Sequence, residues 1–176
     1  MHKIATPRLW LIPATVASMK AELRSPRSLS RNLNVRMPKV WPPPPFNDEA
    51  SQRWMLNYLE SHEQSRWGMY YILLRGRDRQ LIGNCGFKGE PLKNSIEVGY
   101  AICPEFRRHG YAAEAVDRLL RHAFDDPNIN RVLAETFPDL IGSIGVLRKN
   151  KFVRVRGGSE PGVIRFSHTR ARWLAS

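Results

Sequence analysis

The sequence Arg107-Arg108-His109-Gly110-Tyr111-Ala112 lies between a predicted strand and the start of a predicted long helix. A helix N-terminus attracts anions, because its first N–H groups are unpaired and its dipole end is positive. Gly110 allows a turn and a close approach of the backbone to a ligand, and the two arginines add charge there. The stretch predicts a site for a phosphate or pyrophosphate; an ordinary basic loop with a glycine turn is the alternative.

The spacing of apolar residues predicts the elements on either side of this loop. A strand over 96–102 precedes the loop, and a helix over 111–124 follows it. The other predicted elements are an extended segment over 6–13, helices over 14–24, after Asn47 or Asp48 and over 139–149, and strands over 67–75, 80–87, 131–137, 152–156 and 163–168. This order predicts a single α/β domain over residues 1–176, with an antiparallel start and a crossover in the middle of the sheet.

Two segments between these elements have special residues. The stretch 27–46 lacks a clear period and contains four successive prolines over 42–45, which predict an extended, solvent-facing chain. Gly83 and Gly86 fall within one predicted strand and indicate a bulge or a close approach of another backbone.

Composition limits the class of protein. The chain has 176 residues, of which 42% are hydrophobic and 25% charged, as expected for one soluble globular domain. No apolar run approaches the roughly 18 residues of a membrane helix, and the N-terminus lacks a signal-peptide core. Cys85 and Cys103 show no metal-ligand spacing, so we predict no metal and a reducing, cytoplasmic location.

The charge balance is strongly basic. There are 28 Lys and Arg residues against 16 Asp and Glu, a net charge of +12, and most of the basic residues are arginine. Arginine suits phosphate and carboxylate partners, so a polyanionic partner is one interpretation. A basic surface without a specific partner is the other.

Several motifs, in order along the chain, resemble the GNAT superfamily of N-acetyltransferases. Arg107, Gly110 and Ala112 match its phosphate-loop pattern Q/R-x-x-G-x-G/A. The branch that the chain most resembles is that of the ribosomal-protein N-terminal acetyltransferases (RimJ/RimL-like). Its motifs are matched by a Thr-x-Arg-Leu-x-Leu segment over 6–11, a Gly-x-x-Gly-Phe strand over 83–87 and a Glu-Val-Gly-Tyr strand over 97–100.

The resemblance implies the GNAT fold, in which a mixed central sheet flanked by helices splits between two central strands. It also implies acetyl-CoA as co-substrate, with the pantetheine arm in the split and the acetyl carbonyl beside the strand that ends near Ile102. The cofactor-binding residues that it implies are Tyr100, Ala101, Ile102, Arg107, Arg108, His109, Gly110, Tyr111 and Ala112.

Glu97 is the implied catalytic base, acting directly or through a water on the attacking amine. The alternative is a solvated carboxylate or an ion-pair partner for one of the many arginines. Glu135, on the neighbouring strand, is a second candidate for the same role.

Ser143 is the implied proton donor to the CoA sulfur, by resemblance to the serine of an Asn-x-x-Ser motif. Leu140 stands at the asparagine position, and Lys151 stands where the family usually has glycine. The tyrosine that other branches use four residues after the serine is replaced by Leu147. A serine that is merely exposed or bonded to the backbone is the alternative.

The predicted function is transfer of an acetyl group from acetyl-CoA to a primary amine, by direct attack in a ternary complex. The acceptor is a peptide N-terminus or a small-molecule amine, and association with the ribosome or a homodimer is compatible with the resemblance. The aromatic residues Trp41, Phe46, Trp54 and Trp67 belong either to the core or to the acceptor groove. The alternative function is a degenerate module that binds acyl-CoA or RNA without transfer.

Overall fold

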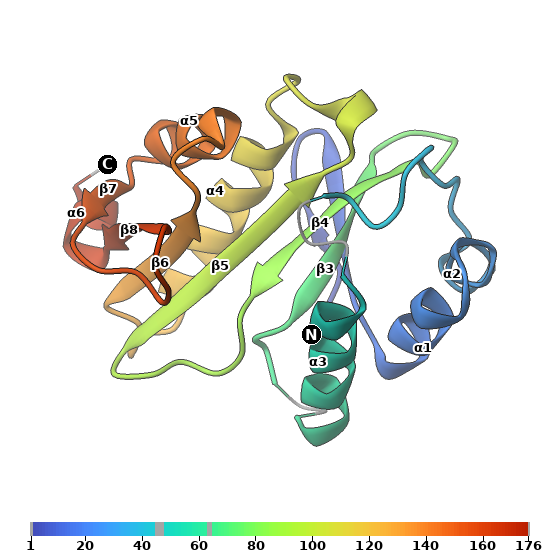
Figure 1. The fold of residues 1–176 in the computed structure, drawn as a ribbon, viewed down its shortest axis with the longest axis horizontal. Helices are drawn as coiled ribbons and strands as arrows, with labels where there is room; N and C mark the ends of the chain where they lie inside the picture. Colours follow the sequence, from blue (N-terminus) through green and yellow to red (C-terminus); the bar gives the residue numbers. More distant parts are fainter. Residues whose placement is uncertain (1, 45–47, 63–64, 176) are drawn as a thin grey trace.

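The computed structural model describes residues 2–44, 48–62 and 65–175 and contains one eight-stranded sheet (Figure 1). The strand order across the sheet is β1-β2-β3-β4-β5-β6-β8-β7. The strands are β1 (Ile4–Ala5), β2 (Leu9–Pro13), β3 (Met69–Leu74), β4 (Leu81–Phe87), β5 (Ser95–Ile102), β6 (Arg131–Thr136), β7 (Val153–Val155) and β8 (Ile164–Thr169). The helices are α1 (Val16–Arg24), α2 (Pro26–Leu33), α3 (Glu49–Ser61), the short 3-10 helix η1 (Pro104–Phe106), α4 (Tyr111–Phe124), α5 (Ile141–Lys149) and α6 (Arg170–Leu174).

The centre of the sheet splits between β5 and β6, as the resemblance implies. All neighbouring strands are antiparallel except β5 and β6, which pair in parallel. Their register covers only 95–97 against 131–133, and no further pair joins them within the described residues. From residue 98 onward, the edge of β5 that faces β6 therefore has no strand partner. This opening lies next to the loop that leads into α4.

The two faces of the sheet carry separate cores. The larger core lies on the face covered by α4 and α5, and includes Val98, Leu119 and Val132. The smaller core lies under α1, α2 and α3, and includes Leu29 and Leu59. Burial of these apolar side chains holds one helical layer on each face and leaves β5 in the middle of the molecule (Figure 1).

The glycines of β4 have the predicted close backbone approach. A Cβ at Gly83 would collide with the carbonyl oxygen of Ala101, and one at Gly86 with that of Gly68. The β3–β4 register also shifts between Ile72 and Leu73. Only glycine therefore fits at these two positions of β4.

The segment 25–44 differs from its prediction. It contains α2, which begins with Pro26 at its first position and Ser25 as its N-cap. Leu29 is the one residue that this short helix buries, so the sequence has no apolar period to detect. The proline run is not solvent-facing throughout, because Pro43 is buried; Pro45 and Phe46 lie outside the described residues.

Candidate active site

The loop between β5 and α4 has the form of an anion site. Gly110 is the N-cap of α4, and its φ of 79° lies in the left-handed region that favours glycine. Within the described part of the chain, the backbone N–H groups of 108–113 have no hydrogen-bond acceptor. These N–H groups and the positive end of the helix dipole can bind a phosphate.

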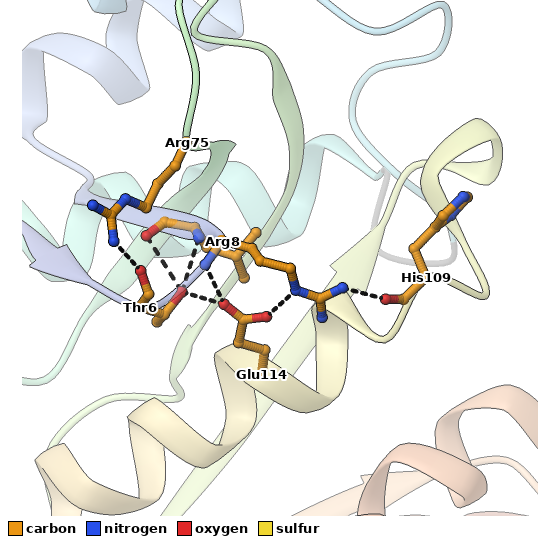
Figure 2. Close-up of polar contacts among 6 residues, drawn as sticks. Thr6, Arg8, Arg75, His109 and Glu114 are labelled. Atoms are coloured by element: carbon orange, nitrogen blue, oxygen red, sulfur yellow. Dashed lines mark hydrogen bonds and ion pairs between the residues drawn. The ribbon is translucent and has the colours of Figure 1, made fainter.

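This loop is held in place by the turn between β1 and β2, near the N-terminus (Figure 2). The Arg8 guanidinium donates from Nε to Glu114 Oε2 at 2.6 Å and from Nη1 to the His109 carbonyl at 2.9 Å. Glu114, in the first turn of α4, also accepts from Thr6 Oγ1 at 2.6 Å and from the Arg8 N–H at 2.8 Å. Arg75 Nη1 donates to the Thr6 carbonyl at 2.6 Å. The network therefore fixes the loop against β2.

The pKa of Glu114 reflects this network. Burial raises the pKa, but the hydrogen bonds from Thr6 and Arg8 and the charge of Arg8 outweigh it and hold it below its usual value. Glu114 was missed by the sequence analysis, although Thr6 and Arg8 were recognised as part of a motif. Thr6 and Arg8 donate hydrogen bonds to the carboxylate of Glu114 and so orient it.

The predicted cofactor-binding side chains of the loop fall into different environments. Arg107 donates to the carbonyls of Ile102 and Pro44, both at 2.9 Å, so its guanidinium ties the loop to the end of β5. Arg108 is exposed and has a φ of 64°. The His109 ring is stacked on Tyr111, with a centroid distance of 5.6 Å. Tyr111 and Ala112 form the half-buried first turn of α4.

Ser143 and Tyr100 meet on the other side of the split. The Tyr100 hydroxyl is 3.0 Å from Ser143 Oγ and donates to the Ser143 carbonyl at 3.1 Å. Burial raises the pKa of Tyr100 to about 12, although the hydrogen bond with Ser143 lowers it in part. Tyr100 therefore keeps its proton at neutral pH. Next to it on β5, Ala101 and Ile102 are buried.

The departures from the family pattern in α5 have structural consequences. Leu140 is the N-cap of α5 and makes no side-chain capping bond. Lys151 adopts a φ of 60°, which explains why glycine is favoured at this position. Asn150 Nδ2 donates to the Ala113 carbonyl at 3.2 Å and ties the end of α5 to α4.

The two candidate bases are both in ion pairs. The Glu97 side chain is 21% exposed and pairs with Lys88. Glu135 pairs with Arg165 at 2.6 Å and also accepts from the backbone N–H of Ser159 at 2.9 Å. Burial raises the pKa of Glu135, but the bonds from Ser159 and Arg165 outweigh it and lower the pKa. A lowered pKa makes Glu135 a weak base at neutral pH.

A pocket of about 530 Å³ lies between the α1 and α3 helices and the β4–β5 part of the sheet. We call it the α1–α3 pocket; it is lined by Met19, Glu22, Pro42, Ala50, Ser51, Gln52, Trp54, Met55, Met69, Asn84, Cys85, Gly86, Phe87, Lys88, Gly99 and Tyr100. Trp54 lines it and is 49% exposed, whereas Trp67 is buried in the larger core. Glu22 was missed by the sequence analysis.

Neither cysteine has the setting of a reactive thiol. Cys103, next to the loop, is buried, and burial raises its pKa to about 12. Within the described residues, no three His, Cys, Asp or Glu side chains are grouped as metal ligands would be. Among the same residues, no helix combines the length and the apolar character needed to cross a membrane.

Solved structures show that this is an acetyltransferase fold. An acetyltransferase from Agrobacterium tumefaciens aligns with a TM-score of 0.69 at 23% identity, over 97% of this chain and 95% of that one. RimL, a ribosomal L7/L12 alpha-N-protein acetyltransferase in complex with coenzyme A, aligns with a TM-score of 0.69 at 18% identity, over 97% and 99% of the two chains. The predicted fold class is confirmed.

Sequence comparison identifies the family. The family model of the acetyltransferase (GNAT) domain matches residues 8–153, so the chain belongs to the GNAT family and is an acetyltransferase. The uncharacterized N-acetyltransferase YjdG of Bacillus subtilis is 25% identical over 154 residues, which cover 87% of this chain and 90% of the relative.

Proposed function

We propose that the protein transfers the acetyl group of acetyl-CoA to a primary amine in a ternary complex. The observation that supports this proposal is that three features adjoin β5: the anion-binding loop, the split from β6 and the α1–α3 pocket. The N–H groups of 108–113 lie at one end, the split from β6 begins at residue 98, and the α1–α3 pocket reaches Gly99 and Tyr100 on the other face. Cofactor and acceptor can therefore reach β5 from different directions.

The residues present fit acetyl-CoA. The pyrophosphate is bound by the N–H groups of 108–113, with Arg108 supplying charge in solvent. The pantetheine arm pairs with the free edge of β5 in the split, as an added strand would. The backbone of 100–102 polarises the acetyl carbonyl.

Bound acetyl-CoA supplies a thioester carbonyl that a neutral amine attacks, and the CoA thiolate leaves. Glu97 takes the proton of the attacking nitrogen, directly or through a water, and its ion pair with Lys88 orients it on β5. Ser143 gives a proton to the departing sulfur. The Tyr100 hydroxyl, 3.0 Å from Ser143 Oγ, holds the serine in position, and solvent returns the proton to Ser143.

The acceptor is a peptide N-terminus or a small-molecule amine. RimL acts on ribosomal L7/L12, and its fold extends over nearly the whole of this chain. A net charge of +12 would favour association with the ribosome, because ribosomal RNA is polyanionic.

The proposal is tested by CoA release from acetyl-CoA with a panel of peptides and small amines. Glu97→Gln and Ser143→Ala should each lower kcat about a hundredfold or more, since each removes a proton-transfer group. The matched controls are Glu60→Gln and Ser61→Ala on the outer surface of α3, which should leave kcat unchanged. Tight CoA binding without transfer to any amine would contradict the proposal.

A further inference from the structure

Glu22 is a buried carboxylate in the wall of the α1–α3 pocket. It lies on α1, is 8% exposed, and each of its two oxygens accepts one hydrogen bond. Trp41 Nε1 donates to Oε1 at 2.9 Å, and the Tyr71 hydroxyl donates to Oε2 at 2.7 Å. Trp41 can only donate, so this arrangement suits an ionised carboxylate.

None of the residues that the structure describes forms an ion pair with this carboxylate. None of the ion pairs among residues 2–44, 48–62 and 65–175 includes Glu22. Lys88, the other charged residue in the pocket wall, is paired with Glu97. A buried carboxylate without a counter-ion costs free energy that a cationic ligand would recover.

The sheet register separates Glu22 from the acetyl site. Tyr71 on β3, Asn84 on β4 and Ala101 on β5 are paired in one row. Neighbouring strands are ~4.8 Å apart, so β3 and β5 are about 10 Å apart. The hydrogen bond from Tyr71 places Glu22 above β3, whereas the acetyl carbonyl in the proposed function lies at β5. Glu22 is therefore too far away to meet the reacting nitrogen.

The surface of the pocket between these points is mostly apolar. Met19, Trp54, Met55 and Met69 line it, and they suit a hydrocarbon chain. A ligand that crosses the pocket from β5 to Glu22 would bury its apolar middle and place one polar end at each side.

From this arrangement we propose that the acceptor is a primary amine with a second cationic group, which binds Glu22 about 10 Å from the nitrogen that is acetylated. This inference rests on the proposed function and specifies its acceptor. It also explains how a basic protein can accept a cationic substrate, since the pocket has its own buried negative charge.

The experiment compares α,ω-diamines of graded length with alkyl monoamines of matched length. The wild type should acetylate the best diamine with a kcat/KM at least tenfold above that of its matched monoamine. Glu22→Gln has nearly the same shape, and it should remove this preference by raising the KM for the diamine. Glu60→Gln, which removes a paired surface carboxylate on α3, should retain the preference.

A second variant keeps the charge and moves it. Glu22→Asp shortens the side chain by one methylene, so the preferred diamine should become longer. Equal kcat/KM for diamines and monoamines in the wild type would overturn the inference. So would an equal loss for both acceptors in Glu22→Gln.

Calorimetry with CoA-saturated protein separates this inference from the proposed function. Diamine binding that weakens at least tenfold in Glu22→Gln supports the role of Glu22 even where no amine is acetylated. Transfer to amines in which Glu22 makes no difference supports the proposed function and overturns the inference.

Discussion

Glu114 and Glu22 are both shielded from solvent, but the protein treats them in opposite ways. Glu114, at the phosphate loop, has an arginine and a hydroxyl as partners, and its pKa is lowered. Burial raises the pKa of Glu22, in the α1–α3 pocket, and the bonds from Tyr71 and Trp41 offset this only in part. A carboxylate that is paired with a cation of the protein, such as Glu114, stabilises the fold. A buried carboxylate without such a cation, such as Glu22, can bind a cationic ligand.

Among the changes that compare the loop with the α1–α3 pocket, Gly110→Val is expected to have the largest effect, and it acts on CoA binding. A β-branched residue at a φ of 79° costs about 1–3 kcal/mol, and a Cβ there would lie 3.4 Å from Arg8 Nη2. CoA affinity, measured by calorimetry, should fall about 10- to 100-fold. Gly76→Ala is the matched control, because a Cβ at Gly76 meets no atom within 4 Å and CoA affinity should not change. An unchanged CoA affinity in Gly110→Val would show that this loop does not bind the cofactor.

Glu114→Gln removes the ion pair between Glu114 and Arg8, and with it the difference between Glu114 and Glu22. Charged hydrogen bonds contribute about 1.5–3 kcal/mol, so Tm at neutral pH should fall by roughly 3–10 °C. A lowered folded-state pKa gives stability that is present above the unfolded value and lost as the pH falls through the folded value. The difference in Tm between wild type and variant should therefore close in acid, below the usual pKa of 4.5. A difference that is constant with pH would contradict the assignment.

Trp54→Ala tests whether the α1–α3 pocket binds the acceptor and not acetyl-CoA. Trp54 lines the α1–α3 pocket and stacks on Tyr58, with a centroid distance of 5.7 Å. Loss of its apolar surface should raise the acceptor KM about 3- to 10-fold, which corresponds to roughly 1 kcal/mol. The KM for acetyl-CoA should stay within twofold. An equal rise in both constants would mean that the pocket does not belong to the acceptor alone.

Glu22→Gln should have the smallest effect on stability, with the opposite sign. The raised pKa means that the stability associated with Glu22 is full below the unfolded value and is lost as the pH rises through the folded value. The neutral amide avoids this loss, so thermal melts should show a Tm above that of the wild type at neutral pH. The two Tm values should converge in acid. A variant that is less stable than the wild type at neutral pH would indicate that Glu22 has an internal cation.

The sequence predicts the strand and the helix on either side of the 107–112 loop, because their signals are local. Gly110 and the helix that follows are adjacent in the chain, whereas the split was expected only from the resemblance to the GNAT superfamily. The motif alone indicates Ser143, which lies on α5, but it does not reveal its partner Tyr100, which lies on β5. The resemblance named Tyr100 as a backbone contact to the acetyl group and gave no role to its hydroxyl.

Trp54 was named as a candidate for the acceptor groove and lines the α1–α3 pocket, but Glu22 was missed because its contacts join distant segments. Glu22 is 19 residues from Trp41 and 49 residues from Tyr71, and no spacing in the sequence predicts either hydrogen bond. The segment between 27 and 46 lacks a period, so α2 was missed as well. Burial of a charged side chain depends on tertiary packing, which helical periodicity does not reveal.

The bond from Arg8 to the His109 carbonyl spans 101 residues and has a consequence for folding. During synthesis, β2 leaves the ribosome long before the loop that it must hold. Contacts of such long range form slowly, because the intervening chain must first be ordered. The loop over 107–112 should thus be among the last parts to reach its native form. In a refolding time course, CoA binding should recover after the helical signal of circular dichroism.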